Sequence, residues 1–161
     1  MTIEIRRLGP GDEDVLASLA READDFDLAG ASRPEPALRA EDAAAYLADP
    51  AVVHWVAVEG GGVIGELLCH VLRLPSGHGK ELLLYAIGVR GSHRRRGIGT
   101  ALVREMLAYA RADGIDEVWV LADNQAAEAF YAACGFVPGD EEQAVYLQRR
   151  AASDPETSPR P

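Results

Sequence analysis

The spacing of apolar side chains divides the chain into segments with two different periods. Where apolar and polar residues alternate, or where a short apolar run is bounded by turn residues, a strand is predicted. Where apolar residues return every three or four positions, an amphipathic helix is predicted. Strands are expected at residues 2–8, 51–59, 63–74, 81–89 and 117–122, and helices after Asp12 and at 40–48, 98–112 and 125–134.

Short connections between these segments indicate the architecture. Three glycines at 60–62 and a turn at 75–79 join three successive strands, which is typical of an antiparallel meander. The run at 81–89 is almost wholly apolar, as expected for a strand covered on both faces. Residues 136–137 and 144–148 are expected to form a closing hairpin. The predicted fold is a single-domain α/β sandwich with a mixed, largely antiparallel central sheet flanked by helices.

Length, charge and cysteine spacing narrow the number of domains, the partners and the location expected for this protein. The chain has 161 residues, 48% of them apolar, so one domain over residues 1–150 is expected, followed by a polar, proline-rich disordered tail at 151–161. The formal net charge of −10 argues against nucleic acid or an anionic membrane as a partner and fits a cationic one better. Cys69 and Cys134 lack metal-ligand or disulfide spacing, so no metal is expected. No leader or membrane-spanning stretch is recognised, so the expected location is cytoplasmic.

One segment carries candidate binding chemistry: SHRRRGIGTALV, at residues 92–103. A helix that begins near Gly97 leaves its first backbone N–H groups without internal partners, and these groups form an anion site with the helix dipole. Glycines at 97 and 99 let a bulky anion approach the backbone, and the arginines at 94–96 add charge-assisted hydrogen bonds to phosphate oxygens. The segment therefore predicts a cradle for a diphosphate.

This segment has three alternative interpretations besides a diphosphate cradle. A cationic loop that only caps a helix is the plainest alternative. A dinucleotide-binding fingerprint needs a third glycine where Leu102 stands, and a P-loop needs a lysine after its last glycine, which is missing here. Both nucleotide alternatives therefore fail on the residues themselves.

The loop also resembles part of a known family. As R-x-x-G-x-G, residues 94–99 are similar to the acyl-coenzyme A pyrophosphate loop of the GNAT N-acetyltransferase superfamily. Residues 122–138 resemble its second signature, N-x-x-A-x-x-F-Y-x-x-x-G-F, and LLLYAIGV looks like its fourth strand. The loop and the strand before it are also similar to the aminoglycoside 3-N-acetyltransferase branch. That branch carries an aspartate after the strand tyrosine, where this sequence has Ala86.

The resemblance implies acetyl-coenzyme A as the cosubstrate and assigns residues to it. Backbone donors of the loop would hold the pyrophosphate, and the strand before the loop would pair with the pantetheine arm. An asparagine would hydrogen-bond that arm, and a phenylalanine would line its path. The implied cofactor-binding residues are Ile87, Gly88, Val89, Arg94, Arg95, Arg96, Gly97, Ile98, Gly99, Thr100, Asn124 and Phe130.

The resemblance also suggests catalytic candidates. Tyr131 is the candidate general acid, which would protonate the leaving thiolate, with a purely structural core tyrosine as the alternative. A base must also take a proton from the ammonium form of the acceptor. Glu81 is the first candidate for that role, and the alternatives are Glu66, His70 and Asp123.

The expected reaction is direct transfer of an acetyl group to a primary amine of a small cationic acceptor, either an aminoglycoside or a polyamine. A loop is predicted at 24–36, and acidic residues in and beside it either steer such an acceptor or form a solvated charged run. These residues are Glu22, Asp24, Asp25, Asp27 and Glu35. A protein lysine or N-terminal amine is the alternative acceptor, and a non-catalytic acyl-coenzyme A sensor is the alternative function. The resemblance is compatible with a homodimer.

Overall fold

Secondary structure follows the apolar periodicity over most of the computed structural model, which describes residues 2–26, 37–75 and 79–139. The strands are β1 (Glu4–Arg7), β2 (Val52–Glu59), β3 (Gly62–Arg73), β4 (Lys80–Val89) and β5 (Glu117–Val120). The α-helices are α1 (Glu13–Arg21), α2 (Ala40–Ala48), α3 (Ile98–Ala112) and α4 (Gln125–Ala133). Two short 3-10 helices, η1 (Ala23–Phe26) and η2 (Gly91–His93), lie in the connections.

The described strands form one sheet in the order β1-β2-β3-β4-β5. β1 to β4 are antiparallel neighbours, whereas β5 runs parallel to β4. The ladder between β4 and β5 covers only residues 81–84 and 117–120, although β4 continues to Val89. Beyond Leu84, no described strand pairs with that side of β4, so the backbone of residues 85–89 is open to another partner there.

A β-bulge marks the point where β4 leaves β5. Leu68 of β3 opposes Ala86, and the next residue, Cys69, opposes Leu84, so Tyr85 has no partner in β3. A bulge of this kind bends the strand and re-aims the side chain of the extra residue. The Tyr85 side chain accordingly points outward and is 67% exposed.

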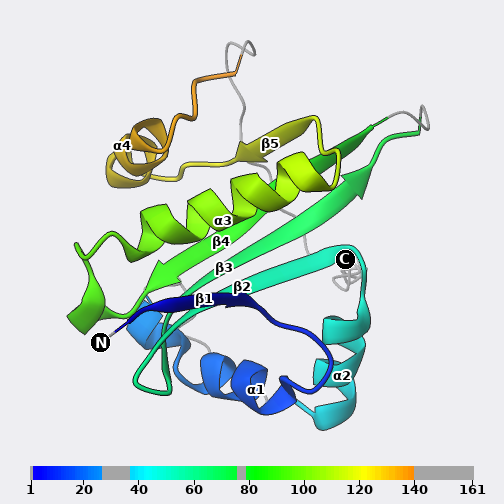
Figure 1. Ribbon diagram of the computed structural model, residues 1–161, viewed down its shortest axis with the longest axis vertical. Coiled ribbons are helices and arrows are strands. Elements are labelled where there is room, and N and C mark those ends of the chain that lie inside the picture. The colour runs from blue at the N-terminus through cyan, green and yellow to red at the C-terminus, as the bar shows by residue number, and fades with distance from the viewer. Residues whose placement is uncertain (1, 27–36, 76–78, 140–161) are drawn as a thin grey trace, which may run out of the picture.

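Helices cover both faces of the sheet (Figure 1), and an apolar cluster lies on each face. α3 packs on one face, where Leu102 and Trp55 of β2 belong to the same cluster, and α1 and α2 pack on the other face around Phe26 and Val56. Trp55 and Val56 belong to different clusters because successive strand side chains point to opposite faces. Leu102 is fully buried, and truncating such a leucine to alanine costs about 2–5 kcal/mol.

The mixed, largely antiparallel sheet is confirmed, and α2 and α3 begin and end where the sequence predicts. The strand predicted at 136–137 is wrong. The backbone N–H of Phe136 donates to the Tyr131 carbonyl at 3.0 Å, so this segment closes the end of α4 instead. The loop predicted from residue 24 begins with η1, because the side chain of Phe26 is buried against the sheet. Residues 144–148 and the tail at 151–161 lie outside the described residues.

Candidate functional site

A groove opens where the end of β4, the start of α3 and the middle of α4 meet. It has a volume of about 180 Å³ and is lined by Ile87, Gly88, Val89, Gly99 and Phe130. All five belong to the set expected to contact the cosubstrate. A Cβ at Gly99 would lie 3.2 Å from the Phe130 ring, so a side chain there would close the groove. Glycine is therefore needed at position 99 to keep the groove open.

The loop before α3 presents its backbone in the way that an anion site requires. Gly97 has a φ of 78° and caps the start of α3, and Arg95 has a φ of 62°. Arg95 is the one non-glycine residue with a positive φ among the described residues. Left-handed residues at 95 and 97 turn the loop sharply just before α3, where the first N–H groups of a helix favour an anion.

The three loop arginines differ in what their side chains do. Arg96 forms a bidentate pair with Glu59 at 2.7 and 2.9 Å, and Arg94 donates from Nε to the Val89 carbonyl at 3.2 Å. Glu59 comes from the end of β2, and Arg96 holds the pKa of that carboxyl below its usual value. His93 adds a contact of 3.5 Å with the same carboxylate. The Arg96 pair therefore anchors the loop to the sheet, and Arg95 is an exposed cation of the loop.

The remaining predicted cosubstrate residues contribute in different ways. The Ile98 side chain is buried in the core, so only its backbone can face a ligand, whereas Thr100 is exposed. Asn124 caps α4, because its Oδ1 accepts from the Ala127 N–H at 2.9 Å. Its Nδ2 donates to Asp123 at 2.7 Å. The Asn124 side chain is thus held in a fixed orientation at the start of α4.

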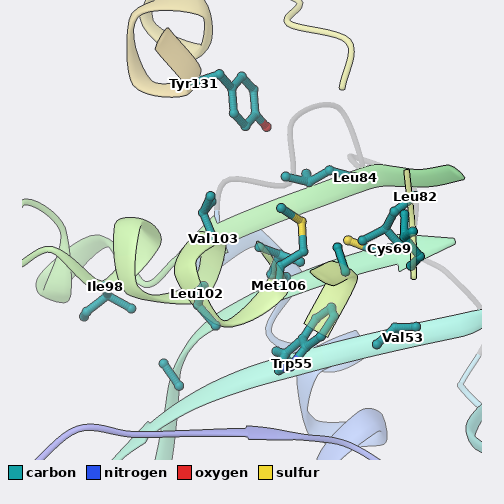
Figure 2. Packing of buried hydrophobic residues seen from close by; sticks show 14 of the residues in the cluster. Val53, Trp55, Cys69, Leu82, Leu84, Ile98, Leu102, Val103, Met106 and Tyr131 are labelled. Atoms are coloured by element: carbon teal, nitrogen blue, oxygen red, sulfur yellow. The ribbon is translucent and has the colours of Figure 1, made fainter. Parts of the chain in front are cut away.

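Tyr131 projects from α4 toward the sheet. Figure 2 shows its ring extending toward Leu84, the last β4 residue that pairs with β5. The ring meets Phe130 and Phe136 edge-on, with centroid distances of 5.3 and 5.7 Å. Burial, followed by the negative charge of Asp123, raises the pKa of the Tyr131 hydroxyl. The hydroxyl therefore keeps its proton at neutral pH and can donate it.

The structure places Glu81 far from the groove. Glu81 lies at the opposite end of β4 from Gly88, which corresponds to roughly 20 Å along the strand. Its Oε2 accepts a hydrogen bond from the Trp119 indole at 3.2 Å. This position does not bring Glu81 together with the other predicted site residues.

Two of the acidic residues expected near the acceptor share one arginine as their ion-pair partner. Arg90, just after β4, pairs with Asp25 at 2.8 Å and also with Glu22. The guanidinium lies over the Phe26 ring, 5.0 Å from its centroid. These contacts fix η1 against β4, where the Phe26 carbonyl would be 2.7 Å from a Cβ at Gly88. Gly88 is therefore needed for the approach of Phe26. Asp27 and Glu35 lie outside the described residues.

A buried polar chain crosses the sheet face that α1 and α2 cover. The Tyr46 hydroxyl lies 3.1 Å from His54 Nδ1, and His54 Nε2 lies 2.9 Å from Glu66 Oε2. The sequence indicates Glu66 as one of several candidate bases, but it does not connect Glu66 with His54. The usable signal was a histidine and a glutamate inside otherwise apolar strands, VVHWVAV and VIGELLC.

Comparisons with known proteins establish the family. The chain matches the Acetyltransferase (GNAT) family over residues 17–136, and it belongs to that family. N-acetyltransferase family 8 member 3 of Mus musculus is 35% identical over 107 residues, which cover 65% of this chain and 47% of the relative. N-acetyltransferase 8 of Rattus norvegicus is 34% identical over 93 residues, which cover 56% and 42%. The matched region thus spans less than half the length of these relatives.

Solved structures share the fold over almost the whole chain. An aminoglycoside acetyltransferase from an uncultured soil metagenomic sample, in complex with trehalose, matches with a TM-score of 0.76 and 26% identity. The complex of that enzyme with sisomicin matches with a TM-score of 0.74 and 26% identity. Both comparisons cover 92% of this chain and 95% of the other.

Residues 2–26, 37–75 and 79–139 lack both a metal-ligating cluster and a helix that could cross a membrane. They contain no cluster of histidine, cysteine and acidic side chains that could hold a metal ion. None of their helices combines the length and the apolar character needed to cross a bilayer.

Proposed function

We propose that this protein transfers the acetyl group of acetyl-coenzyme A to the primary amine of a small cationic acceptor. The observation that carries the proposal is the convergence of β4, α3 and α4 on one groove beside a helix N-terminus. Five residues named from the sequence as cosubstrate contacts line that groove. Membership in the acetyltransferase family supports the same activity.

The donor site fits a thioester that carries a diphosphate. Backbone N–H groups around Arg95 and Gly97 would bind the diphosphate, and the exposed Arg95 side chain adds positive charge. The groove walls at Ile87 and Phe130 suit an apolar arm, and the open backbone of residues 85–89 supplies hydrogen-bond partners along it. Bound there, acetyl-coenzyme A would supply the electrophilic carbonyl carbon.

Tyr131 would act as the general acid of the transfer. Its ring contacts Phe130, which lines the groove, and this contact supports a position of the hydroxyl beside the departing thiolate. The raised pKa of Tyr131 keeps the proton on the hydroxyl until the sulfur departs. A proton donor of this kind contributes about 10²- to 10⁴-fold to a rate.

A small cationic acceptor is favoured by two observations. The formal net charge of the chain is −10, which attracts cations over a distance. In addition, the solved relative that binds sisomicin matches over 92% of this chain. Ala86 replaces the aspartate expected for the aminoglycoside branch, so the acceptor contact must come from other residues.

The proposal is tested by thiol release from acetyl-coenzyme A in the presence of single amines. The panel contains sisomicin, spermidine and a lysine-containing peptide, with acetyl-coenzyme A affinity measured in parallel by calorimetry. Release with sisomicin or spermidine is expected. Thiol release with the peptide alone would favour a protein amine as the acceptor instead of a small cation. Tight binding of acetyl-coenzyme A without thiol release from any amine would favour a non-catalytic acyl-coenzyme A sensor.

A further inference from the structure

Glu66 carries an oxygen that no donor reaches in the described part of the chain. Its Oε2 is bound by His54, but its Oε1 is buried and has no hydrogen-bond partner there. The residue as a whole is only 5% exposed. Leaving a carboxylate oxygen buried without a donor is costly, so such a group calls for a ligand or a functional reason.

Hydrogen bonds link the side chains of Tyr46, His54 and Glu66 in a continuous series. Burial, and then the negative charge of Glu66, raises the pKa of Tyr46, so its hydroxyl stays protonated. The Tyr46 hydroxyl can therefore donate to Nδ1 of His54 when that nitrogen carries no proton, and Nε2–H of His54 can donate to Glu66. Tyr46 and His54 thus hold the Glu66 carboxylate through Oε2, which leaves Oε1 as the oxygen that can accept a proton.

The strand register places Glu66 beside the donor groove. Glu66 opposes Gly88, and two residues further along β3 Leu68 opposes Ala86, at the bulge of β4. Gly88 also lines the groove, and its α-carbon faces Phe26 on the side of the sheet covered by α1 and α2. The Glu66 side chain starts on that same face, because its β2 partner Val56 belongs to the cluster around Phe26.

We propose that Glu66 binds the acceptor amine through Oε1 and takes its proton, with His54 and Tyr46 as positioning residues. This assignment rests on the proposed function and names the base that it requires. The ammonium gives one proton to Glu66, the freed nitrogen pair bonds to the carbonyl carbon, and the carbon–sulfur bond breaks. The departing thiolate takes the Tyr131 proton, and the second surplus proton on nitrogen restores Tyr131.

Other carboxylates and imidazoles considered for this role have different partners. Glu81 lies at the far end of β4 and accepts from Trp119. Asp123 accepts from Asn124. The His70 ring lies edge-on to Tyr85, with a centroid distance of 5.5 Å. Among the base candidates, Glu66 combines burial, an unpartnered oxygen and a position opposite the groove.

The first test is a set of Glu→Gln variants assayed with the amine that wild-type protein acetylates. Glu66→Gln keeps an oxygen for His54 but removes the basic group, so kcat should fall by about 10²- to 10⁴-fold with unchanged affinity for acetyl-coenzyme A. Glu105→Gln, an exposed position on α3, is the matched control and should retain wild-type kcat. Full activity in a folded Glu66→Gln protein, or a comparable loss in Glu81→Gln instead, would overturn the assignment.

The pH profile separates proton transfer from a structural role. The base accepts a proton only as a carboxylate, so kcat/KM of the wild type should fall at the acidic end of the pH profile, and Glu66→Gln should lose this acidic limb. The described ionisable groups facing Glu66 are His54 from β2 and Tyr46 from α2, while β4 contributes Gly88 and η1 contributes Phe26. Tyr46→Phe should displace the limb and keep acetyl-coenzyme A affinity, and an unmoved limb would exclude the positioning role.

A binding measurement tests the site without turnover. In wild-type protein carrying ¹³C-labelled glutamate, the Glu66 side-chain carboxyl resonance is assigned by its loss in Glu66→Gln. Spermidine or sisomicin, added with desulfo-coenzyme A, should shift this resonance and leave that of Glu105 in place. A shift without thiol release would refute the proposed function but retain the amine site, whereas no shift would overturn the amine site itself.

Discussion

Replacing Gly88 by alanine tests the contact between η1 and β4. A Cβ at Gly88 would lie 2.7 Å from the Phe26 carbonyl oxygen and 2.9 Å from the Phe26 Cβ. Ordinary contact begins at 3.4 Å, so the space is short by about 0.7 Å. Phe26 has little room to move, because its side chain is 1% exposed and Arg90 lies over its ring. Overpacking of this kind costs about 1–3 kcal/mol.

The expected result of Gly88→Ala is a lower melting temperature. For a domain of this size, each kcal/mol lowers Tm by about 2–4 °C, so a decrease of about 2–12 °C is expected. Thermal unfolding followed by circular dichroism measures the change. Gly91→Ala is the matched control, since a Cβ there meets nothing within 4 Å, and it should leave Tm unchanged or raise it slightly. Equal Tm values for the two variants would refute the packing of η1 on β4.

Substitutions at three further positions test the loop before α3 and the proposed general acid, Tyr131. Because Arg95 has a φ of 62°, Arg95→Val should lower Tm more than Arg95→Gly does, and equal effects in thermal unfolding would contradict the left-handed backbone. Tyr131→Phe should lower kcat about 10²- to 10⁴-fold with unchanged acetyl-coenzyme A affinity. Because the pKa of Tyr131 is raised, the kcat of the wild type should begin to fall through loss of this proton only above pH ~10. Arg96 lowers the pKa of Glu59, so this pair stabilises the fold above the unfolded pKa and is lost as pH falls through the lower folded value. Glu59→Gln should therefore weaken the fall in Tm between roughly pH 5 and pH 3, and an unchanged slope would show that the pair does not stabilise the fold.

The sequence predicted most strongly what local periodicity and backbone chemistry determine. α3 has both a regular apolar stripe and glycines at its ends, so its bounds were predictable to the residue. The groove was predictable because short motifs placed Gly99 and Phe130 on elements that the fold brings together. The side chain of Arg96 was less predictable, since its partner Glu59 is 37 residues away on another strand.

Features that depend on contacts between distant elements were missed. Strand alternation predicts which neighbours within a strand share a face with His54 or with Glu66. Only the register of β2 against β3 brings these two side chains within hydrogen-bonding distance of each other. The burial of Phe26 likewise requires Gly88, 62 positions later, to lack a side chain. Phe136 has the residue type of a strand, yet its contact with the end of α4 decides its conformation. In each case tertiary packing overrides a local preference.

The open stretch of β4 also bears on the solubility of the protein. Unpaired strand edges act as templates for another chain and promote aggregation. Two features make this edge a poor template: the bulge at Tyr85 interrupts its regular spacing, and the Arg94 side chain occupies the last carbonyl, that of Val89. A donor molecule lying along residues 85–89 would shield the same groups, and saturation at a hundredfold over its Kd would add about 2.7 kcal/mol to the folded state. If acetyl-coenzyme A binds there as proposed, its supply would influence the resistance of the chain to self-association through this one strand edge.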